Sequence, residues 1–248
     1  MDKPLKDRVA LVTGAARGIG AATAAALAQA GAHVVAVGRS LDSLKDTEAR
    51  IRNVGGLVTC EAFDLSNLAG ISELAASVGQ RFGKLDVLVG NAATLGNRPL
   101  MKDTGLEDWQ AVIDVNLTAN MQLIRWFDAL LQKSDAPRAV FLTAGSTQHP
   151  RVKGSAYSVA KCGLEGMVRI YAAENENSAL RVNVFNPGAT RTTMRATVAP
   201  DEDPMTLDTP EQVAEKIVSI CLPSVTATGQ LYNYPSKKFM KFTPPVLA

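Results

Sequence analysis

The sequence predicts an α/β fold: a doubly wound parallel sheet of about seven strands with helices on both faces. Three observations predict this class. Short runs rich in Val and Leu recur along the 248 residues, and several are apolar almost throughout, as strands buried on both faces of a parallel sheet are. Longer amphipathic segments alternate with these runs, which is the order of βαβ units. No linker, low-complexity tract or internal repeat interrupts the alternation, so we expect a single domain over residues 1–248.

Each expected strand is a short run dominated by aliphatic or β-branched residues. The expected strands are Val9–Thr13, Val34–Val37, Leu57–Phe63, Leu85–Val89, Ala139–Thr143, Val182–Phe185 and Leu231–Tyr234. Between them lie segments with apolar residues at helical spacing. The expected helices are Ile19–Ala30, Leu41–Val54, Asn67–Phe82, Leu106–Lys133, Ser155–Glu176 and Pro210–Leu222. Thr209 before Pro210 marks the start of the last helix sharply, because threonine is a favoured N-cap and proline fits the first helical position.

Two segments lie outside this alternation. The residues near Arg191–Asp208 are less regular than the rest. A tail that begins at Pro235 carries Lys237, Lys238 and Lys241 and two further prolines. We expect this tail to be a solvated or intersubunit extension rather than a binding patch.

The composition excludes several classes of function. The 26 basic residues nearly balance the 24 acidic ones, whereas a nucleic-acid partner would call for a basic excess or stripe. No apolar run approaches the length that spans a bilayer, and the first residues lack the apolar region of a signal peptide, so no membrane partner is expected. Cys60, Cys162 and Cys221 are widely spaced and include no CxxC pair, which suggests neither a disulfide framework nor a metal site. We therefore expect a cytoplasmic protein without a bound metal.

A glycine-rich turn follows the first expected strand, with the sequence Thr-Gly-Ala-Ala-Arg-Gly-Ile-Gly at positions 13–20. Gly14, Gly18 and Gly20 permit a tight turn and a close approach of the backbone. The helix that opens at Ile19 offers unpaired N–H groups to a pyrophosphate. Such turns also join strands to helices in folds that bind nothing there. The position after the first strand of a βαβ unit favours a dinucleotide site.

The end of the second expected strand indicates which dinucleotide is bound. An NAD site would place an acidic residue near this point to bind the ribose 2′-hydroxyl. The sequence has Gly38 and then Arg39, and an arginine can form a forked contact with a 2′-phosphate. Arg17 in the turn can add a second cation. We expect NADP(H) rather than NAD(H), the alternative being that Arg39 only lies in solvent at the strand edge.

Tyr157 and Lys161 lie four residues apart at the start of an expected helix and therefore share one face. This spacing arises by chance in many chains, but its chemistry suits proton transfer. A free tyrosine titrates near 10, and a nearby lysine cation favours the phenolate. A phenol tuned in this way can donate a proton to a carbonyl or accept one from an alcohol.

With these residues the chain resembles the short-chain dehydrogenase/reductase family, from Arg8 to about Tyr234. The matching motifs occur in the family's order, and they are the turn at 13–20, Asp64-Leu65, Asn91-Ala92-Ala93, Asn116, the Tyr157/Lys161 pair and Asn186-Pro187-Gly188. The family has a Rossmann-type sheet. The segment from Asn186 to Ala196, followed by Glu202-Asp203-Pro204, is similar to one bacterial branch of oxidoreductases with no secure substrate. It lies where family members carry a substrate lid, so we expect it to be mobile when the site is empty.

The resemblance implies a role for each matching residue. Asp64 would meet the adenine amino group, with Leu65 beside the ring. Asn91 and Ala92 would line the cofactor ribose, although Gly90 and Ala93 replace the usual asparagine and glycine. The residues implied to contact the nicotinamide and its carboxamide are Pro187, Gly188, Thr190 and Thr192. Asn116 interrupts an apolar helical stripe; it is either a hydrogen-bonded core amide or, by resemblance, a proton-relay member linked to Lys161 through water.

The chain departs from the family's pattern at Ala144, where the family usually has the serine that holds the substrate oxygen. Ser146 would face as Ala144 does if the strand continued, and Gly145 permits a bend that brings it closer. We therefore expect Ser146 to supply the missing hydroxyl, the alternative being that it is an ordinary polar residue at a strand end.

The resemblance implies an NADP(H)-dependent oxidoreductase that acts on a small-molecule carbonyl or alcohol substrate. The alternative is a sensor or interaction protein of the same fold that binds NADP but has lost its chemistry. Ala144 favours this alternative, and the intact Tyr157, Lys161 and Asn116 oppose it. The two long expected helices, Leu106–Lys133 and Ser155–Glu176, resemble the pair with which the family forms dimers and tetramers, so we expect a homodimer or homotetramer.

Overall fold

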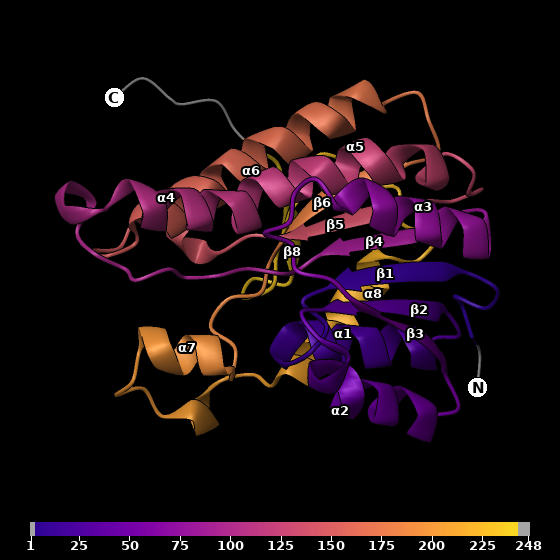
Figure 1. Cartoon of the computed structure of the whole chain (residues 1–248), viewed down its shortest axis with the longest axis horizontal. Helices are drawn as coiled ribbons and strands as arrows, with labels where there is room; N and C mark the ends of the chain where they lie inside the picture. The colour runs from indigo at the N-terminus through magenta and orange to yellow at the C-terminus, as the bar shows by residue number, and fades with distance from the viewer. Residues whose placement is uncertain (1–2, 243–248) are drawn as a thin grey trace.

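A sheet of eight strands forms the centre of the computed structural model, which describes residues 3–242 (Figure 1). The strands are β1 (Val9–Thr13), β2 (His33–Gly38), β3 (Leu57–Ala62), β4 (Val87–Gly90), β5 (Arg138–Leu142), β6 (Arg181–Asn186), β7 (Leu231–Asn233) and β8 (Lys238–Met240). Their order in the sheet is β3-β2-β1-β4-β5-β6-β7-β8, and every neighbouring pair is parallel except β7–β8. The predicted fold class is confirmed. All named strands within residues 3–242 belong to this one sheet, and the single domain over residues 1–248 stays a prediction.

Helices cover both faces of the sheet (Figure 1). The helices are α1 (Gly18–Gln29), α2 (Leu41–Asn53), α3 (Ile71–Phe82), α4 (Leu106–Ile113), α5 (Ala119–Leu131), α6 (Ser155–Glu174), α7 (Thr193–Val198) and α8 (Pro210–Ile220). One face carries α1, α2 and α8, and the other carries α3, α4, α5 and α6. Thr209 caps α8 in a reciprocal capping box with Gln212, as the sequence predicts for this helix start.

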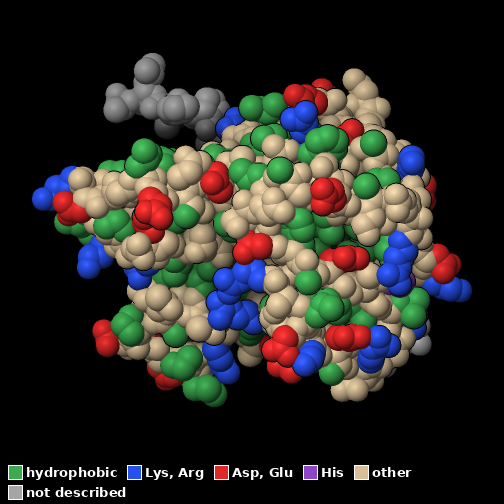
Figure 2. All heavy atoms as spheres, in the orientation of Figure 1, with side chains coloured by type: hydrophobic (Ala, Val, Ile, Leu, Met, Phe, Trp, Pro, Cys, Tyr) green, Lys and Arg blue, Asp and Glu red, His purple; other side chains and the backbone are tan. Residues whose placement is uncertain are grey.

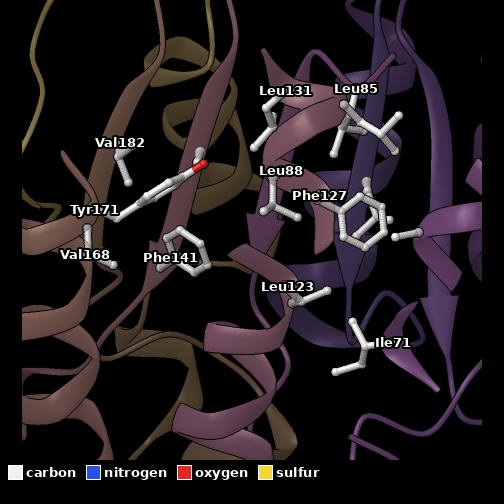
Figure 3. Close-up of a cluster of buried hydrophobic side chains, with 14 of the residues drawn as sticks. Ile71, Leu85, Leu88, Leu123, Phe127, Leu131, Phe141, Val168, Tyr171 and Val182 are labelled. Atoms are coloured by element: carbon white, nitrogen blue, oxygen red, sulfur yellow. The ribbon is translucent and has the colours of Figure 1, made fainter. Parts of the chain in front are cut away.

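Each face of the sheet has its own apolar core, because strand side chains alternate between the two faces. Under α3, α5 and α6 the buried side chains include Ile71, Phe127, Phe141 and Tyr171 (Figure 3). Strands β1, β4 and β5 are buried along their whole length. This accounts for the nearly continuous apolar runs in the sequence.

The strand order reverses at β1, which pairs with β2 on one side and with β4 on the other. In open parallel sheets, ligands bind where the strand order reverses, outside the carboxyl ends of the strands. The turn after β1 and the segment after β4 therefore meet at one point. This point is the position of the cleft described below.

The expected helix Leu106–Lys133 is interrupted. It forms α4 and α5 with a π-helical turn, Asp114–Thr118, between them. Asn116 is fully buried in this turn, and the side chain of Asn120 donates a hydrogen bond of 3.0 Å to the Asn116 carbonyl. The periodicity predicted a continuous helix because the π turn spans only five residues and the segments on both sides of it are helical.

The segment that was expected to be a tail from Pro235 contains the strand β8 instead. Lys237 has a left-handed backbone (φ 56°) and closes the turn, and Phe239 packs edge to face on Tyr232 with ring centroids 5.0 Å apart. A strand of three residues is too short to show a periodicity in the sequence. The two prolines at positions 244 and 245 lie outside the described residues, as do the first two residues of the chain.

Within residues 3–242, no helix has the length and apolar character that crossing a membrane requires. The same part of the chain holds no group of three or more His, Cys, Asp or Glu side chains arranged to bind a metal ion.

Candidate active site and cofactor cleft

A cleft of about 1550 Å³ lies at the carboxyl ends of the strands. Most of the predicted site residues line it. They are Gly14, Arg17, Gly18, Ile19, Gly20, Arg39, Asp64, Leu65, Asn91, Ala92, Tyr157, Lys161, Pro187 and Thr192. In Figure 2, Lys and Arg side chains gather at the centre of the face, between the α7 segment and the layer of α1 and α2. Four predicted residues are not part of the cleft wall: Asn116, Ser146, Gly188 and Thr190.

The glycine-rich turn is held by contacts with the end of β4. Asn91 Nδ2 donates a hydrogen bond of 2.8 Å to the Thr13 carbonyl, and Thr13 Oγ1 accepts from the backbone N–H groups of Asn91 and Ala92 at 3.0 and 3.1 Å. Gly14 has a φ of +64°, and a Cβ there would come within 2.9 Å of Ala92 Cα. A side chain at Gly20 would overlap the Gly14 carbonyl. The turn therefore needs glycine at both positions.

The basic end of the cleft lies beside the start of α2. Arg17 and Arg39 are both exposed and line the cleft. A Cβ at Gly38 would come within 2.9 Å of Leu44 Cδ2, so any larger residue there requires Leu44 to move. Two further residues of α2, Ser43 and Arg50, line the same end. Sequence reasoning missed them because an exposed polar residue on a helix has no distinguishing spacing.

The segment after β3 forms another part of the cleft wall. Asp64 is exposed, and its Oδ1 accepts hydrogen bonds of 2.9 Å from both the backbone N–H and the Oγ of Ser66. This turn leaves the second carboxylate oxygen of Asp64 free to accept another bond. Leu65 is buried beside it and supplies an apolar surface.

Tyr157 and Lys161 lie on one face of α6, one helical turn apart. Lys161 is buried, with 2% of its surface exposed. Its Nζ donates a hydrogen bond of 2.7 Å to the Leu142 carbonyl at the end of β5. The same Nζ lies 5.9 Å from the centre of the Tyr157 ring. Burial raises the pKa of Tyr157 to about 12. Burial also lowers the pKa of Lys161 to about 8, and the nearby charge of Glu165 opposes this change. Each group is therefore biased toward its neutral form, as desolvation dictates.

Asn116 lies behind the cleft wall and ties two segments together. Its amide donates to the Thr94 carbonyl at 2.8 Å and accepts from the Thr94 N–H at 2.9 Å. Thr94 itself lines the cleft. These contacts are those of a hydrogen-bonded core amide, which was one of the two alternatives for Asn116. Its role in a proton relay stays a prediction.

Gly90, which replaces the usual asparagine of the family motif, lies against the amide of Asn120. A Cβ at position 90 would come within 2.5 Å of Asn120 Oδ1 and would overlap the ring of Phe141. Asn120 is 3% exposed. Its amide therefore occupies the space that a side chain at position 90 would need.

Strand β5 ends at Leu142 and does not continue to Ser146, because residues Gly145–Thr147 form a 3-10 turn. Ser146 Oγ is buried and has no hydrogen-bond partner in the part of the chain that the structure describes. The turn is anchored by Glu165, whose Oε1 accepts bonds of 2.7 Å from Thr143 Oγ1 and 2.8 Å from Thr147 Oγ1. Sequence reasoning missed Glu165, although its spacing of four from Lys161 was visible.

The irregular segment Arg191–Asp208 contains α7 and covers one side of the cleft. Arg195 and Glu202 form an ion pair with Nη2–Oε1 at 2.6 Å. Arg191 donates to the carbonyls of Pro204 and Leu207 at 2.7 and 3.1 Å. These bonds hold the segment together internally, and its mobility stays a prediction.

Comparisons with known proteins agree with this geometry. A family model described as short chain dehydrogenase matches residues 8–203. An uncharacterized oxidoreductase of Escherichia coli, YciK, is 35% identical over 218 residues, which is 84% of each chain. A short chain dehydrogenase structure from Pseudomonas syringae has a TM-score of 0.90 and 39% identity and covers 94% of this chain and 96% of its own. One from Shigella flexneri, complexed with NADP, has a TM-score of 0.89 and 33% identity and covers 94% and 99% of the two chains.

The burial of Lys161 predicts a pH dependence of stability. Its pKa falls from 10.5 to about 8 on folding, so between these values the unfolded chain binds a proton that the folded chain lacks. The free energy of unfolding of the wild type should therefore rise from about pH 8 to about pH 10 relative to that of Lys161→Met, by on the order of 3 kcal/mol. Urea denaturation of both proteins across this range measures the difference. A difference that does not change with pH would contradict the assignment.

Proposed function

The chain belongs to the short-chain dehydrogenase family, and on this basis we propose that it is an NADP(H)-dependent oxidoreductase that transfers a hydride between nicotinamide and a carbonyl or alcohol substrate. One observation carries the proposal: the cleft that is lined by the glycine-rich turn and the two arginines at one end is also lined by Tyr157 and Lys161. The groups expected to bind the cofactor and those expected to move the proton thus line the same cleft.

The residues present fit a dinucleotide. Glycines at positions 14 and 20 let the turn pack closely on itself and on Ala92, where a Cβ would collide, and within residues 3–242 the Arg17 side chain makes no capping hydrogen bond to α1. The N–H groups at the start of this helix are therefore available to a pyrophosphate. We assign the 2′-phosphate to Arg17 and Arg39, the adenine to Asp64 and Leu65, and the ribose to Asn91 and Ala92. We assign the nicotinamide side to Pro187, Gly188, Thr190 and Thr192.

The bound cofactor supplies the hydride, and the side chains of this chain move the proton. Tyr157 Oη donates its proton to the substrate oxygen in reduction and accepts it in oxidation. The pKa of about 12 that burial imposes on Tyr157 is too high for this role near neutral pH, so a cationic Lys161 is needed to stabilise the phenolate. We place Asn116 in the relay that returns the proton to Lys161.

Ser146 is proposed as the hydroxyl that holds the substrate oxygen. Its Oγ is buried without a partner, and a buried hydroxyl without a partner costs free energy that a bound substrate could recover. This atom lies on the turn next to Ala144, where the family's serine is missing.

The second candidate function, an NADP-binding sensor or interaction protein, is favoured by Ala144 alone. Oxidation of NADPH against a panel of ketones and aldehydes separates the two candidates. Turnover of any carbonyl supports the enzyme, whereas tight cofactor binding without turnover supports the sensor.

We further propose that the chain forms a homodimer or homotetramer through the helices α4, α5 and α6. Large apolar side chains are exposed on all three of them: Leu106 on α4, Met121 and Trp126 on α5, and Val159 and Ile170 on α6. The cytoplasmic location and the small-molecule substrate belong to the same proposal.

NADP(H) should bind more tightly than NAD(H), because Arg39 can form a charge-assisted contact with the 2′-phosphate. Such a contact contributes about ten- to a hundredfold in affinity. Fluorescence titration of both cofactors measures the preference, and Arg39→Ala should remove most of it. Lys45→Ala is the control, since this cation lies on α2, six residues after Arg39, but does not line the cleft. Equal affinity for the two cofactors in the wild type would contradict the prediction.

Tyr157→Phe should abolish turnover and leave cofactor binding nearly unchanged. The hydroxyl contributes acid–base catalysis of about 10²–10⁴-fold and little ground-state affinity. Steady-state rates and cofactor titration are measured on the same preparation. Tyr232→Phe is a matched control, because the Tyr232 hydroxyl is buried without a partner and lies outside the cleft wall. A Tyr157→Phe enzyme with wild-type rates would show that another group transfers the proton.

Ser146→Ala should lower kcat by about 10²–10³-fold, as the loss of one donor to a reacting oxygen does. Ala144→Ser should raise the rate in that background if the usual position is still within reach of the substrate. Both variants are compared on one working substrate. An unchanged rate in Ser146→Ala would remove Ser146 from the mechanism.

A further inference from the structure

We propose that Glu165 is a positioning residue of this site: its carboxylate fixes the Ala144–Ser146 turn against α6 and places a negative charge one helical turn from Lys161. This inference rests on the proposed function and extends it to a residue outside the family's motifs quoted above. Tyr157, Lys161 and Glu165 follow one another at intervals of four along α6, so they share one face of the helix.

Glu165 accepts hydrogen bonds from the residues on both sides of the Ala144–Ser146 turn. Its Oε1 accepts from Thr143 Oγ1 at 2.7 Å and from Thr147 Oγ1 at 2.8 Å, one residue before Ala144 and one after Ser146. The Thr147 hydroxyl also lies 3.0 Å from the Ala144 carbonyl, so its single proton faces two acceptors. A charged acceptor forms the stronger bond, which favours the carboxylate.

Thr143 is 3% exposed and lines the cleft, and its N–H donates 2.9 Å to the Phe185 carbonyl of β6. The strand end is therefore held by the sheet on one side and by Glu165 on the other. A shift of Glu165 would move the wall next to Tyr157. The unpartnered Ser146 Oγ lies between the two threonine anchors along the chain.

The charge of Glu165 acts on Lys161. Within residues 3–242, Glu165 is the charged group that opposes the effect of burial on this lysine, and the other titratable group that faces Nζ is the Tyr157 ring. Glu165 raises the pKa of Lys161, whereas burial lowers it. A cationic Lys161 is the form that stabilises the Tyr157 phenolate.

Two substitutions separate the charge from the hydrogen bonds. Glu165→Gln keeps an amide oxygen that can accept from both threonines but removes the charge. Thr147→Val removes one hydrogen bond and keeps the charge. Both changes nearly conserve side-chain volume, so both proteins are expected to fold.

The first measurement needs no turnover. The free energy of unfolding is measured against pH for the wild type and Lys161→Met, and again for Glu165→Gln and the double variant Lys161→Met/Glu165→Gln. The rise in stability that depends on Lys161 should begin about one pH unit lower in the Glu165→Gln pair, because Lys161 loses its proton more easily without the carboxylate. The Thr147→Val background should leave this onset unchanged. Equal onsets in the wild-type and Glu165→Gln pairs would overturn the proposal.

The second measurement uses a working carbonyl substrate and NADPH. Glu165→Gln should move the alkaline limb of the kcat profile to lower pH with little change in KM. Thr147→Val should keep the profile and lower kcat/KM by about tenfold through the loosened turn. Wild-type kinetics in both variants would also overturn the proposal. If the wild type turns over no carbonyl, the proposed function fails, while the stability measurement still decides the role of Glu165.

Discussion

The pairing of β1 with β2 on one side and with β4 on the other is the constraint on which the rest of the structure depends. Because both neighbours are parallel to β1, the three strands end at the same edge of the sheet. The turn after β1 and the segment after β4 then come close enough for Asn91 to hold the Thr13 carbonyl and for Thr13 to hold Asn91 and Ala92. The glycine requirement at positions 14 and 20 is a consequence of that closeness. The conformation of the glycine-rich turn therefore depends on the strand order of the sheet as well as on the turn's own sequence.

Elsewhere in the cleft, the proposed chemistry relies on Lys161 of α6, whose buried Nζ reaches the end of β5. Burial favours the neutral form of both groups, since it raises the pKa of Tyr157 to about 12 and lowers the pKa of Lys161 to about 8. The Leu142 carbonyl satisfies one donor of Lys161, and Glu165 provides an opposing charge from the next helical turn. The same carboxylate holds the turn after β5. Electrostatic tuning and positioning of the wall therefore have one origin, and a change at Glu165 affects both.

Two departures from the family's usual pattern are accommodated in different ways. At Gly90, the amide of Asn120 occupies the space beside β4 that a side chain would need. The same amide donates a hydrogen bond to the carbonyl of Asn116 in the π turn. At Ala144 the carbonyl accepts a hydrogen bond of 3.0 Å from Thr147 Oγ1. The neighbouring turn carries a buried hydroxyl without a partner, Ser146 Oγ. The first departure is therefore accommodated by packing, while the second bears on the role proposed for Ser146.

The sequence by itself determined the fold class, most strand and helix positions, the glycine-rich turn and the spacing of Tyr157 and Lys161. All of these are local: they follow from periodicity, from caps and from residue types within a few positions of one another. Only the tertiary structure decided the π turn around Asn116, the strand β8, the end of β5 before Ser146 and the anchoring role of Glu165. These features depend on which distant backbone or side-chain group comes within hydrogen-bond reach after packing. A pattern of apolar residues records which side chains are buried, but it does not record which polar groups they bring together.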